Sequence, residues 1–262
     1  MPFHNKQGLR YFQFSIFDGL PLFHAVLTRR GGSSQRPFES LNFGGTVGDN
    51  PDDVLKNHKK TFEVLNFDFR SRFDVWQVHG NEILCANAPR DPKSGFQKAD
   101  GILTDNPGIT LFMRFADCVP ILLADPTKGV IGIVHAGWEG TLKQISRLAI
   151  EKMSEQYGSN PADIRAGIGP SICGSCYQVG KDVLTAFKKS FGDKAEMFFQ
   201  NKDSRLYLDL WTANRFSLET SGVEKIEVAG LCTAENLDDW FSHRAEGGRT
   251  GRFGVLMSLV DN

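Results

Sequence analysis

Two apolar runs separated by the polar stretch DPTKG stand near the middle of the chain, within residues 112–140. Each run has the length of a buried strand, and the stretch between them is typical of a turn. With Pro126 and Thr127 as a two-residue loop, the runs pair as a hairpin that places Cys118 directly opposite His135. We therefore expect this thiol and imidazole about 5 Å apart. A longer loop would shift the register.

The rest of the chain mixes helical and strand-like patterns. A helix is predicted over 50–65, because Asn50 can cap it and Pro51 suits its first turn. The segment 73–86 is predicted as two short strands that turn at residues 79–81. Further helices are expected over 141–158, over 181–192 and after a strand that begins near 205. Because strands and helices do not alternate strictly, the pattern favours an α+β or mixed α/β fold.

No repeat, low-complexity stretch or Pro/Ser-rich linker divides the chain, so residues 1–262 are predicted to form one domain. The Gly- and Ser-rich loop between about 28 and 50 is long for a compact domain, which is typical of a functional segment.

The composition indicates which classes of partner and which cellular compartment to expect. The formal net charge of −1 gives no electrostatic reason to expect a nucleic acid or a membrane surface as partner. No apolar stretch reaches the roughly 18 residues of a membrane span. The first residues lack the layout of a signal peptide, and the five cysteines are an odd number. We therefore expect a cytoplasmic protein with reduced thiols.

The cysteine and histidine of the central runs are candidate metal ligands. A buried cysteine or histidine is usually structural. Here, however, we expect Pro120 to interrupt strand pairing after Cys118, and His135 stands at a predicted strand end just before Gly137. A catalytic zinc site needs about three protein ligands and an open position. His79, in a tight turn between apolar runs, is the natural third ligand.

A second cysteine motif, CGSC at residues 173–176, has the spacing of a zinc half-site or a redox pair. The chain holds no second pair with this spacing, and no thioredoxin-like pattern precedes the motif. A tight turn with incidental cysteines is therefore the favoured interpretation.

At these motifs the sequence resembles the laccase-domain (polyphenol oxidase-like) family, whose members are also described as purine nucleoside phosphorylases. The specific combination is ADC-P with HAGW-GT, inside KADGILTDNPGITLFMRFADCVPILLADPTKGVIGIVHAGWEGTL. Supporting segments cover nearly the whole chain: TRRGGSSQRPFESLNFGGTVGDNPDDVLKN, WQVHGNEI, IGPSICGSCYQVG and CTAENLDDWFSHRAEGGRTGR.

The resemblance implies a fold, a metal and an activity. The fold is a cysteine-hydrolase-like α/β/β/α sandwich with mixed sheets. One zinc ion per chain is bound by His79, Cys118 and His135, with water or a phosphate oxygen completing the shell. The implied activity is phosphorolysis of adenosine, inosine and methylthioadenosine, with adenosine deamination as a second activity. Purine nucleosides and phosphate are then the partners, and we expect a monomer or a small homo-oligomer.

The sequence departs from the family at two places that bear on substrate preference. Where the family often has a Gly-Pro-Cys-Cys run before the tyrosine, this chain reads SICGSCY. After Arg244 the family often has a second arginine, but here Ala245 follows.

Catalytic and substrate-binding candidates follow from chemistry and position. Cys118 and His135 are catalytic candidates, together with Asp117, which could be a general base or could hold a ligand histidine. Phosphate needs cationic or hydrogen-bonding donors. The remaining candidates each have a structural interpretation beside the functional one: Arg29 and Arg244 for phosphate, Ser40 and Asn42 as hydrogen-bond donors, Gln77 and Asn81 as pocket residues, and Trp138 as a stacking surface for a purine.

Three other functions compete with a zinc-dependent nucleoside enzyme. The same ligands can hold copper, as in a polyphenol oxidase, although six scattered histidines do not form the clusters that efficient oxygen reduction needs. Cys118 could be the nucleophile and His135 the base of a cysteine hydrolase that edits a cell-wall precursor. The chain could also be a non-enzymatic binding module with a structural metal.

Overall fold

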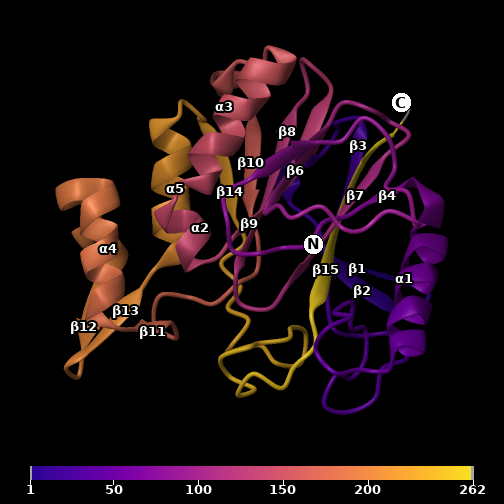
Figure 1. The fold of residues 1–262 in the computed structure, drawn as a ribbon, viewed down its shortest axis with the longest axis horizontal. Coiled ribbons are helices and arrows are strands. Elements are labelled where there is room, and N and C mark those ends of the chain that lie inside the picture. Colours follow the sequence, from indigo (N-terminus) through magenta and orange to yellow (C-terminus); the bar gives the residue numbers. More distant parts are fainter. Residues whose placement is uncertain (1, 261–262) are drawn as a thin grey trace.

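The structure is a computed structural model that describes residues 2–260. Its centre is formed by two six-stranded mixed sheets (Figure 1). The first sheet has the order β1 (Phe3–Lys6), β2 (Leu9–Phe12), β3 (Leu22–Leu27), β15 (Phe253–Leu259), β7 (Thr110–Phe115) and β4 (Arg72–Phe73). The second has the order β14 (Lys225–Val228), β10 (Arg165–Ile168), β8 (Val119–Asp125), β9 (Val130–Ala136), β6 (Gly101–Thr104) and β5 (Ile83–Cys85).

Helices cover the outer faces of both sheets. On one side, α1 (Pro51–Leu65) packs Phe62 and Leu65 into an apolar cluster with Leu27 and Leu256 of the first sheet. On the other side lie α2 (Trp138–Leu142), α3 (Ile145–Tyr157) and α5 (Leu210–Thr220). Beyond them, α4 (Lys181–Phe191) accompanies a small sheet of β11 (Gln178–Val179), β13 (Arg205–Leu208) and β12 (Phe199–Lys202) (Figure 1). Short 3-10 helices are η1 (Ser15–Phe17), η2 (Phe69–Ser71), η3 (Pro161–Asp163) and η4 (Gly192–Phe198).

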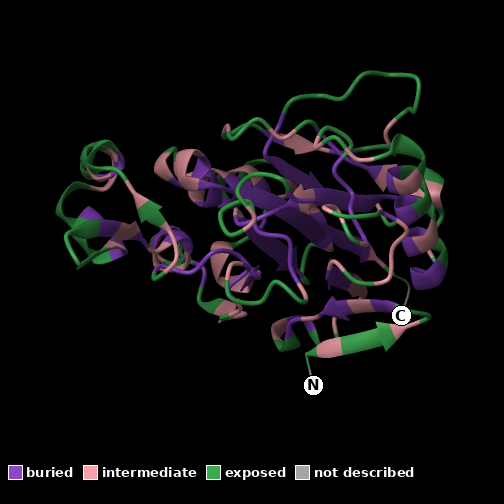
Figure 2. Ribbon diagram, turned by 90° about the horizontal axis from the view of Figure 1, so that it is seen from below, coloured by how far each residue is buried: buried purple, intermediate pink, exposed green. Residues whose placement is uncertain are grey.

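The central strands are apolar throughout because both of their faces are buried. Along β8, Ile121 and Leu123 pack into the cluster beneath α3 and α5, whereas Leu122 and Ala124 pack into the layer between the two sheets. Figure 2 shows the same arrangement, with buried residues concentrated in the central strands and exposed residues in the peripheral loops. The layers therefore run helix, sheet, sheet, helix, and the predicted fold class is confirmed.

Several predicted helices are confirmed. The side chain of Asn50 accepts a hydrogen bond from the Asp52 backbone N–H at 2.9 Å at the start of α1. Gly158 ends α3 with a left-handed φ of 67°. The predicted helix over 141–158 is, however, two helices. The chain turns at Gln144, which has a φ of 57°, so α2 ends before α3 begins.

The predicted register of the central hairpin is wrong. The strands β8 and β9 pair from Val119↔Ala136 to Asp125↔Val130, so residues 126–129 form the loop. The Asp125 carboxylate accepts the backbone N–H of Thr127 at 2.8 Å and of Lys128 at 3.1 Å, which stabilises this longer turn. The register moves by an even number of residues, so alternate side chains keep their faces.

The segment 73–86 also differs from expectation. Its flanking strands do not pair with each other: β4 pairs with β7 in the first sheet, and β5 pairs with β6 in the second. The connection that carries His79 therefore crosses from one sheet to the other. No helix within residues 2–260 combines the length and apolar character that a membrane span requires.

Candidate metal centre

Three predicted ligands from separate segments meet at one end of the two sheets. His79 lies on the crossing segment, Cys118 lies directly before β8, and His135 lies near the end of β9. One nitrogen of each histidine and the Cys118 sulfur lie within 4.8 Å of one another. The hairpin contributes two of the donors although Pro120, not Cys118, faces His135 in the ladder.

A buried carboxylate, Asp100, holds the ring of His135 and the backbone of His79. Its Oδ1 accepts hydrogen bonds from His135 Nδ1 at 2.8 Å and from the His79 backbone N–H at 3.0 Å. Its Oδ2 accepts the backbone N–H groups of Gly80 at 2.7 Å and Val78 at 3.1 Å. The proton of His135 is thereby held on Nδ1, and Nε2 is left for the donor cluster. Asp100 was not among the candidates from the sequence, where its one signal is a carboxylate directly before an apolar run.

Close packing also fixes the donor positions. A Cβ added to Gly137 would lie 2.9 Å from Cys118 Sγ and 3.2 Å from His79 Cδ2. His79 itself has a left-handed φ of 57°, an uncommon conformation that the hydrogen bonds to Asp100 help to hold.

The electrostatics favour a thiolate beside an imidazolium when no metal is bound. Burial opposes ionisation of Cys118, but His135 and His79 outweigh burial and lower the pKa of the thiol to about 6. Burial also opposes charge on His135, but Cys118 and Asp100 raise the pKa of this imidazole to about 9. For Asp100, burial opposes ionisation, yet its bonds to His135 and to backbone N–H groups keep the pKa below its usual value.

This donor set fits a metal ion such as zinc. One thiolate and two imidazoles are ligands of both zinc and copper. Three protein donors leave a fourth position for a reactant, as in catalytic zinc sites. Within residues 2–260, this is the one cluster of three or more potential metal donors that contains a histidine. The additional histidine clusters of a multi-copper oxidase are therefore not present in the described part of the chain.

The three donors line a cavity of about 670 Å³, a size typical of small-ligand sites. Arginine and aromatic side chains form much of its wall. Trp76 and Phe96 are 47% and 42% exposed, which is unusual for large aromatic residues. The Arg90 guanidinium covers the Phe96 ring at 4.1 Å from its centre, so a ligand can reach the part of this ring that Arg90 leaves exposed. The cationic and aromatic side chains that line the cavity are Arg114, Arg244, Arg252, Trp76, Phe96, Trp138 and Tyr177.

The substrate-binding candidates divide between this cavity and other places. Arg244 lines the cavity, where its guanidinium lies 5.0 Å from the centre of the Tyr177 ring. Arg29 and Ser40 line a different surface pocket. The Arg29 guanidinium donates to Glu246 at 3.0 Å and to backbone carbonyls, so its contacts are structural. Asn42 is fully buried and shapes the cavity wall indirectly, since it accepts the Gly44 N–H at 2.8 Å.

Of the other pocket candidates from the sequence, some line the cavity and one does not. Gln77 and Trp138 line the cavity, whereas exposed Asn81 is not among its lining residues. Arg114 and Arg252 were not among the candidates from the sequence. The signal for Arg114 is a lone cation inside the apolar run that became β7, whereas Arg252 follows a polar, Gly-rich stretch without such a signal.

Asp117 lies beside Cys118 and lines the cavity. Its carboxylate accepts hydrogen bonds from Thr233 Oγ1 at 2.6 Å and from the Arg244 backbone N–H at 2.7 Å. Asp100, rather than Asp117, carries the hydrogen bond to a ligand histidine. Asp117 therefore positions the loop that presents Arg244.

Comparison with known proteins gives consistent results. Residues 23–260 match the family model described as multi-copper polyphenol oxidoreductase laccase. Purine nucleoside phosphorylase YlmD of Bacillus subtilis (strain 168) is 40% identical over 241 residues, which cover 89% of this chain and 86% of that protein. Purine nucleoside phosphorylase YfiH of Escherichia coli (strain K12) is 32% identical over 235 residues, with 89% and 92% covered.

A solved structure agrees with these sequence matches. The crystal structure of YlmD from Geobacillus stearothermophilus has a TM-score of 0.92 and 31% identity, and the match covers 99% of each chain. This chain therefore belongs to the multi-copper polyphenol oxidoreductase laccase family, and its curated relatives are named purine nucleoside phosphorylases of the YfiH and YlmD type.

Proposed function

We propose that this chain is a purine nucleoside phosphorylase that holds one zinc ion on His79, Cys118 and His135. Its substrates are phosphate and adenosine, inosine or methylthioadenosine, with adenosine deamination as a side activity. The observation that carries the proposal is the convergence of three metal donors on a cavity with arginine and aromatic walls. The names of the relatives point to the same reaction.

The cavity walls suit the two substrates. In phosphorolysis, a phosphate oxygen bonds to C1′ of the ribose while the bond from C1′ to the base breaks, and the electron pair leaves with the base. Arg244 and Arg252 bring positive charge to an anionic phosphate. Trp76 and Phe96 offer flat apolar surfaces to the purine. When bound, zinc supplies a Lewis-acidic charge on the cavity floor.

The chain's own residues prepare the metal site. Asp100 keeps the His135 proton on Nδ1 and fixes the backbone around His79. Asp117 holds the backbone of Arg244 through the hydrogen bond to its N–H. These contacts fix the donors and the cation relative to each other before substrate binds, which reduces the entropic cost of reaching the reactive arrangement.

The proposal includes the cytoplasm as the location. All five cysteines are free, and a reducing compartment keeps the low-pKa Cys118 available as a ligand.

The test is a metal analysis combined with product analysis. Protein purified without added metal should contain zinc rather than copper. With phosphate, adenosine and inosine should yield ribose 1-phosphate and free base, and methylthioadenosine the corresponding sugar phosphate. His79→Ala should lower kcat/KM roughly 100-fold or more, whereas the exposed His4→Ala, outside the cavity, should not. Release of ammonia from adenosine tests the deaminase activity.

The thiolate and imidazolium that form without metal favour one rival, a cysteine hydrolase. Activity that survives complete removal of zinc and is abolished by thiol alkylation would support that rival and contradict our proposal. Oxidation of phenols as the main activity of the copper-loaded protein would instead support the oxidase.

A further inference from the structure

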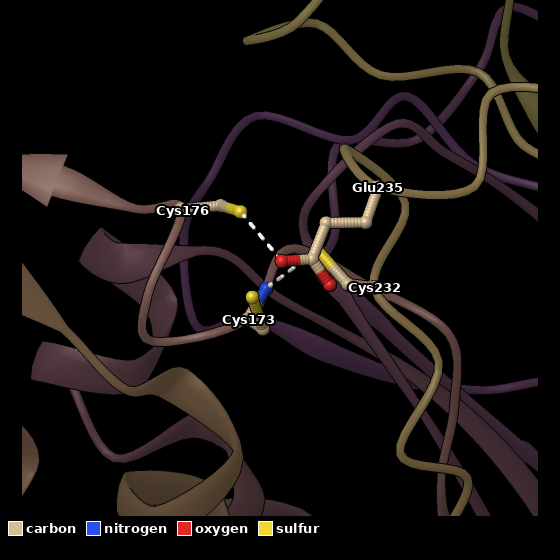
Figure 3. A group of neighbouring side chains, drawn as sticks. All are labelled: Cys173, Cys176, Cys232 and Glu235. Carbon is tan, nitrogen blue, oxygen red and sulfur yellow. Dashed lines mark hydrogen bonds between the residues drawn. The ribbon is translucent and has the colours of Figure 1, made fainter.

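A second group of potential metal donors lies outside the histidine-containing centre. Figure 3 shows Cys173, Cys176, Cys232 and Glu235 facing one another across two loops. The three cysteine sulfurs and one carboxylate oxygen of Glu235 lie within 4.8 Å of one another. Cys176 Sγ donates to Glu235 Oε1 at 3.4 Å, and the Cys173 backbone N–H donates to Cys232 Sγ at 3.4 Å.

The two loops use the same short spacing. CGSC supplies donors at positions 173 and 176, and CTAE supplies donors at 232 and 235. The first loop closes through hydrogen bonds from the N–H groups of Cys176 and Tyr177 to the Cys173 carbonyl, both at 3.1 Å. Two donors separated by two residues are typical of structural zinc sites. The sequence contains no second CxxC because the motif that faces CGSC is CTAE, in which a glutamate takes the place of the second cysteine.

Backbone pairing brings the loops together. Ser171 and Cys232 form a parallel bridge, in which the Ser171 N–H donates to the Leu231 carbonyl and the Thr233 N–H donates to the Ser171 carbonyl, each at 3.1 Å. The donors are therefore gathered by the fold itself. Cys173 and Cys232 are 8% and 3% exposed, whereas Glu235 is exposed at the surface. A metal ion could enter from the Glu235 side.

We propose that Cys173, Cys176, Cys232 and Glu235 form a second, structural site for a thiolate-preferring divalent metal such as zinc. Four protein donors are the number that a structural zinc site uses, so an ion held by all four would have no position left for a reactant. This distinguishes the second site from the three-donor centre. A redox pair needs two cysteines only, whereas here a third cysteine and a carboxylate complete the group.

A metal ion at this second site would stabilise the cavity wall. The loop with Cys173 also holds Asp117, because the Ile172 N–H donates to the Asp117 carbonyl at 3.0 Å. The loop with Cys232 holds the same residue through Thr233 Oγ1 at 2.6 Å. An ion between the loops would therefore fix Asp117, which adjoins the ligand Cys118. The second site thus acts as a positioning element.

The first test isolates the second site. In the variant His79→Ala/Cys118→Ser/His135→Ala, added Co²⁺ should bind at about one ion per chain. Its spectrum should show strong thiolate-to-cobalt absorption, which the removed centre cannot supply. Adding Cys176→Ser should abolish this absorption, and adding Cys85→Ser, a cysteine outside both groups, should preserve it. Absence of cobalt binding in the isolating variant, with its circular dichroism intact, would overturn the proposal.

The second test uses the otherwise intact protein and does not depend on that variant folding. Zinc analysis should give about two ions per chain for the natural sequence and for Cys85→Ser, and about one for Cys176→Ser. Glu235→Gln, at an exposed position, should release one ion to a chelator at least about 10-fold more readily. Equal zinc content in all variants, or a disulfide among the three cysteines in protein kept under cytoplasm-like reducing conditions, would overturn the proposal.

Discussion

Gly137 lies against two of the three candidate ligands, where a Cβ would meet Cys118 Sγ and His79 Cδ2. Its φ of −71° suits any residue, so a side chain is excluded by the 2.9 Å approach to Cys118 Sγ rather than by backbone strain. We expect Gly137→Ala to weaken zinc binding at least about 10-fold by displacing the ligands. Chelator competition measures this affinity. Gly95→Ala, where a Cβ would meet nothing within 4 Å, is the control. Equal affinities of Gly137→Ala and the control would contradict the close packing.

The ionisation of Cys118 and His135 predicts a pH dependence of metal binding. Near pH 7 the thiol, with a pKa of about 6, is mostly ionised, and the imidazole, with a pKa of about 9, is mostly protonated. Zinc needs both groups deprotonated, so each ion should displace about one proton from His135. Zinc affinity should therefore rise about tenfold per pH unit between pH 6 and 9, and this contribution should level off above 9.

Calorimetry in buffers of different ionisation enthalpy measures the released proton directly. A zinc affinity that stays constant between pH 7 and 8.5 would show that His135 is already neutral in the metal-free protein.

Single residues differ in how far the sequence could identify them. His79, Cys118 and His135, whose donor atoms the fold brings together, could be named as candidate ligands because few residue types bind metals and each stands at the end of an apolar run. Asp100 was not recognisable, because its role depends on the pairing of β6 with β9, which places Gly101 opposite Val134. Arg29 looked like an anion-binding residue beside two glycines, but its hydrogen bonds go to Glu246 and to carbonyls.

At the scale of elements, the Asn57 side chain of α1 makes several hydrogen bonds to the long Gly- and Ser-rich loop. Asn57 is fully buried, accepts the Ser33 N–H at 2.7 Å, and donates to the Asn42 carbonyl at 2.9 Å. Asn57→Ala leaves these groups unpaired and should lower the free energy of unfolding by about 1–3 kcal/mol. Urea denaturation measures the change. Lys59→Ala, at an exposed position of α1, should leave the midpoint unchanged. Equal midpoints for both variants would contradict this role of Asn57.

Local signals predicted the helices better than they predicted the strand connections. The Asn50 cap and Gly158 define helix ends through contacts within a few residues, so they could be read from the sequence. The β8–β9 register depends on hydrogen bonds to the Asp125 side chain, which stabilise the longer turn. The partner of each short strand around His79 depends on distant strands, and nothing near residues 73–86 specifies a crossing between sheets.

At the scale of the whole molecule, the layer between the sheets should make unfolding cooperative. Ile133 is fully buried in this layer. Ile133→Ala should cost about 2–5 kcal/mol. Tryptophan fluorescence and circular dichroism should still report one coincident transition, as expected of a single domain. Thr127→Ala, in the exposed hairpin loop, should change stability little. Two separate transitions would contradict the prediction of one domain.

The layered architecture was predictable from the family resemblance, but the cavity was not. Its wall combines Gly44, on the loop that follows β3, with Tyr177 and Arg244 from distant loops. Such a wall forms only when both sheets and their connections are assembled. The pairing of the CGSC loop with the CTAE loop was hidden for the same reason, because Ser171 meets Cys232 only in the folded chain.

The contacts of Asp100 make the exchange of three backbone amides a measure of the state of the metal centre. The backbone amides of Val78, His79 and Gly80 all donate to this one carboxylate, which also binds His135. Loosening of His135 should therefore loosen three consecutive amides together. Hydrogen–deuterium exchange of a peptide that covers them would follow loading and loss of the ion without any label, with slower exchange in the loaded protein.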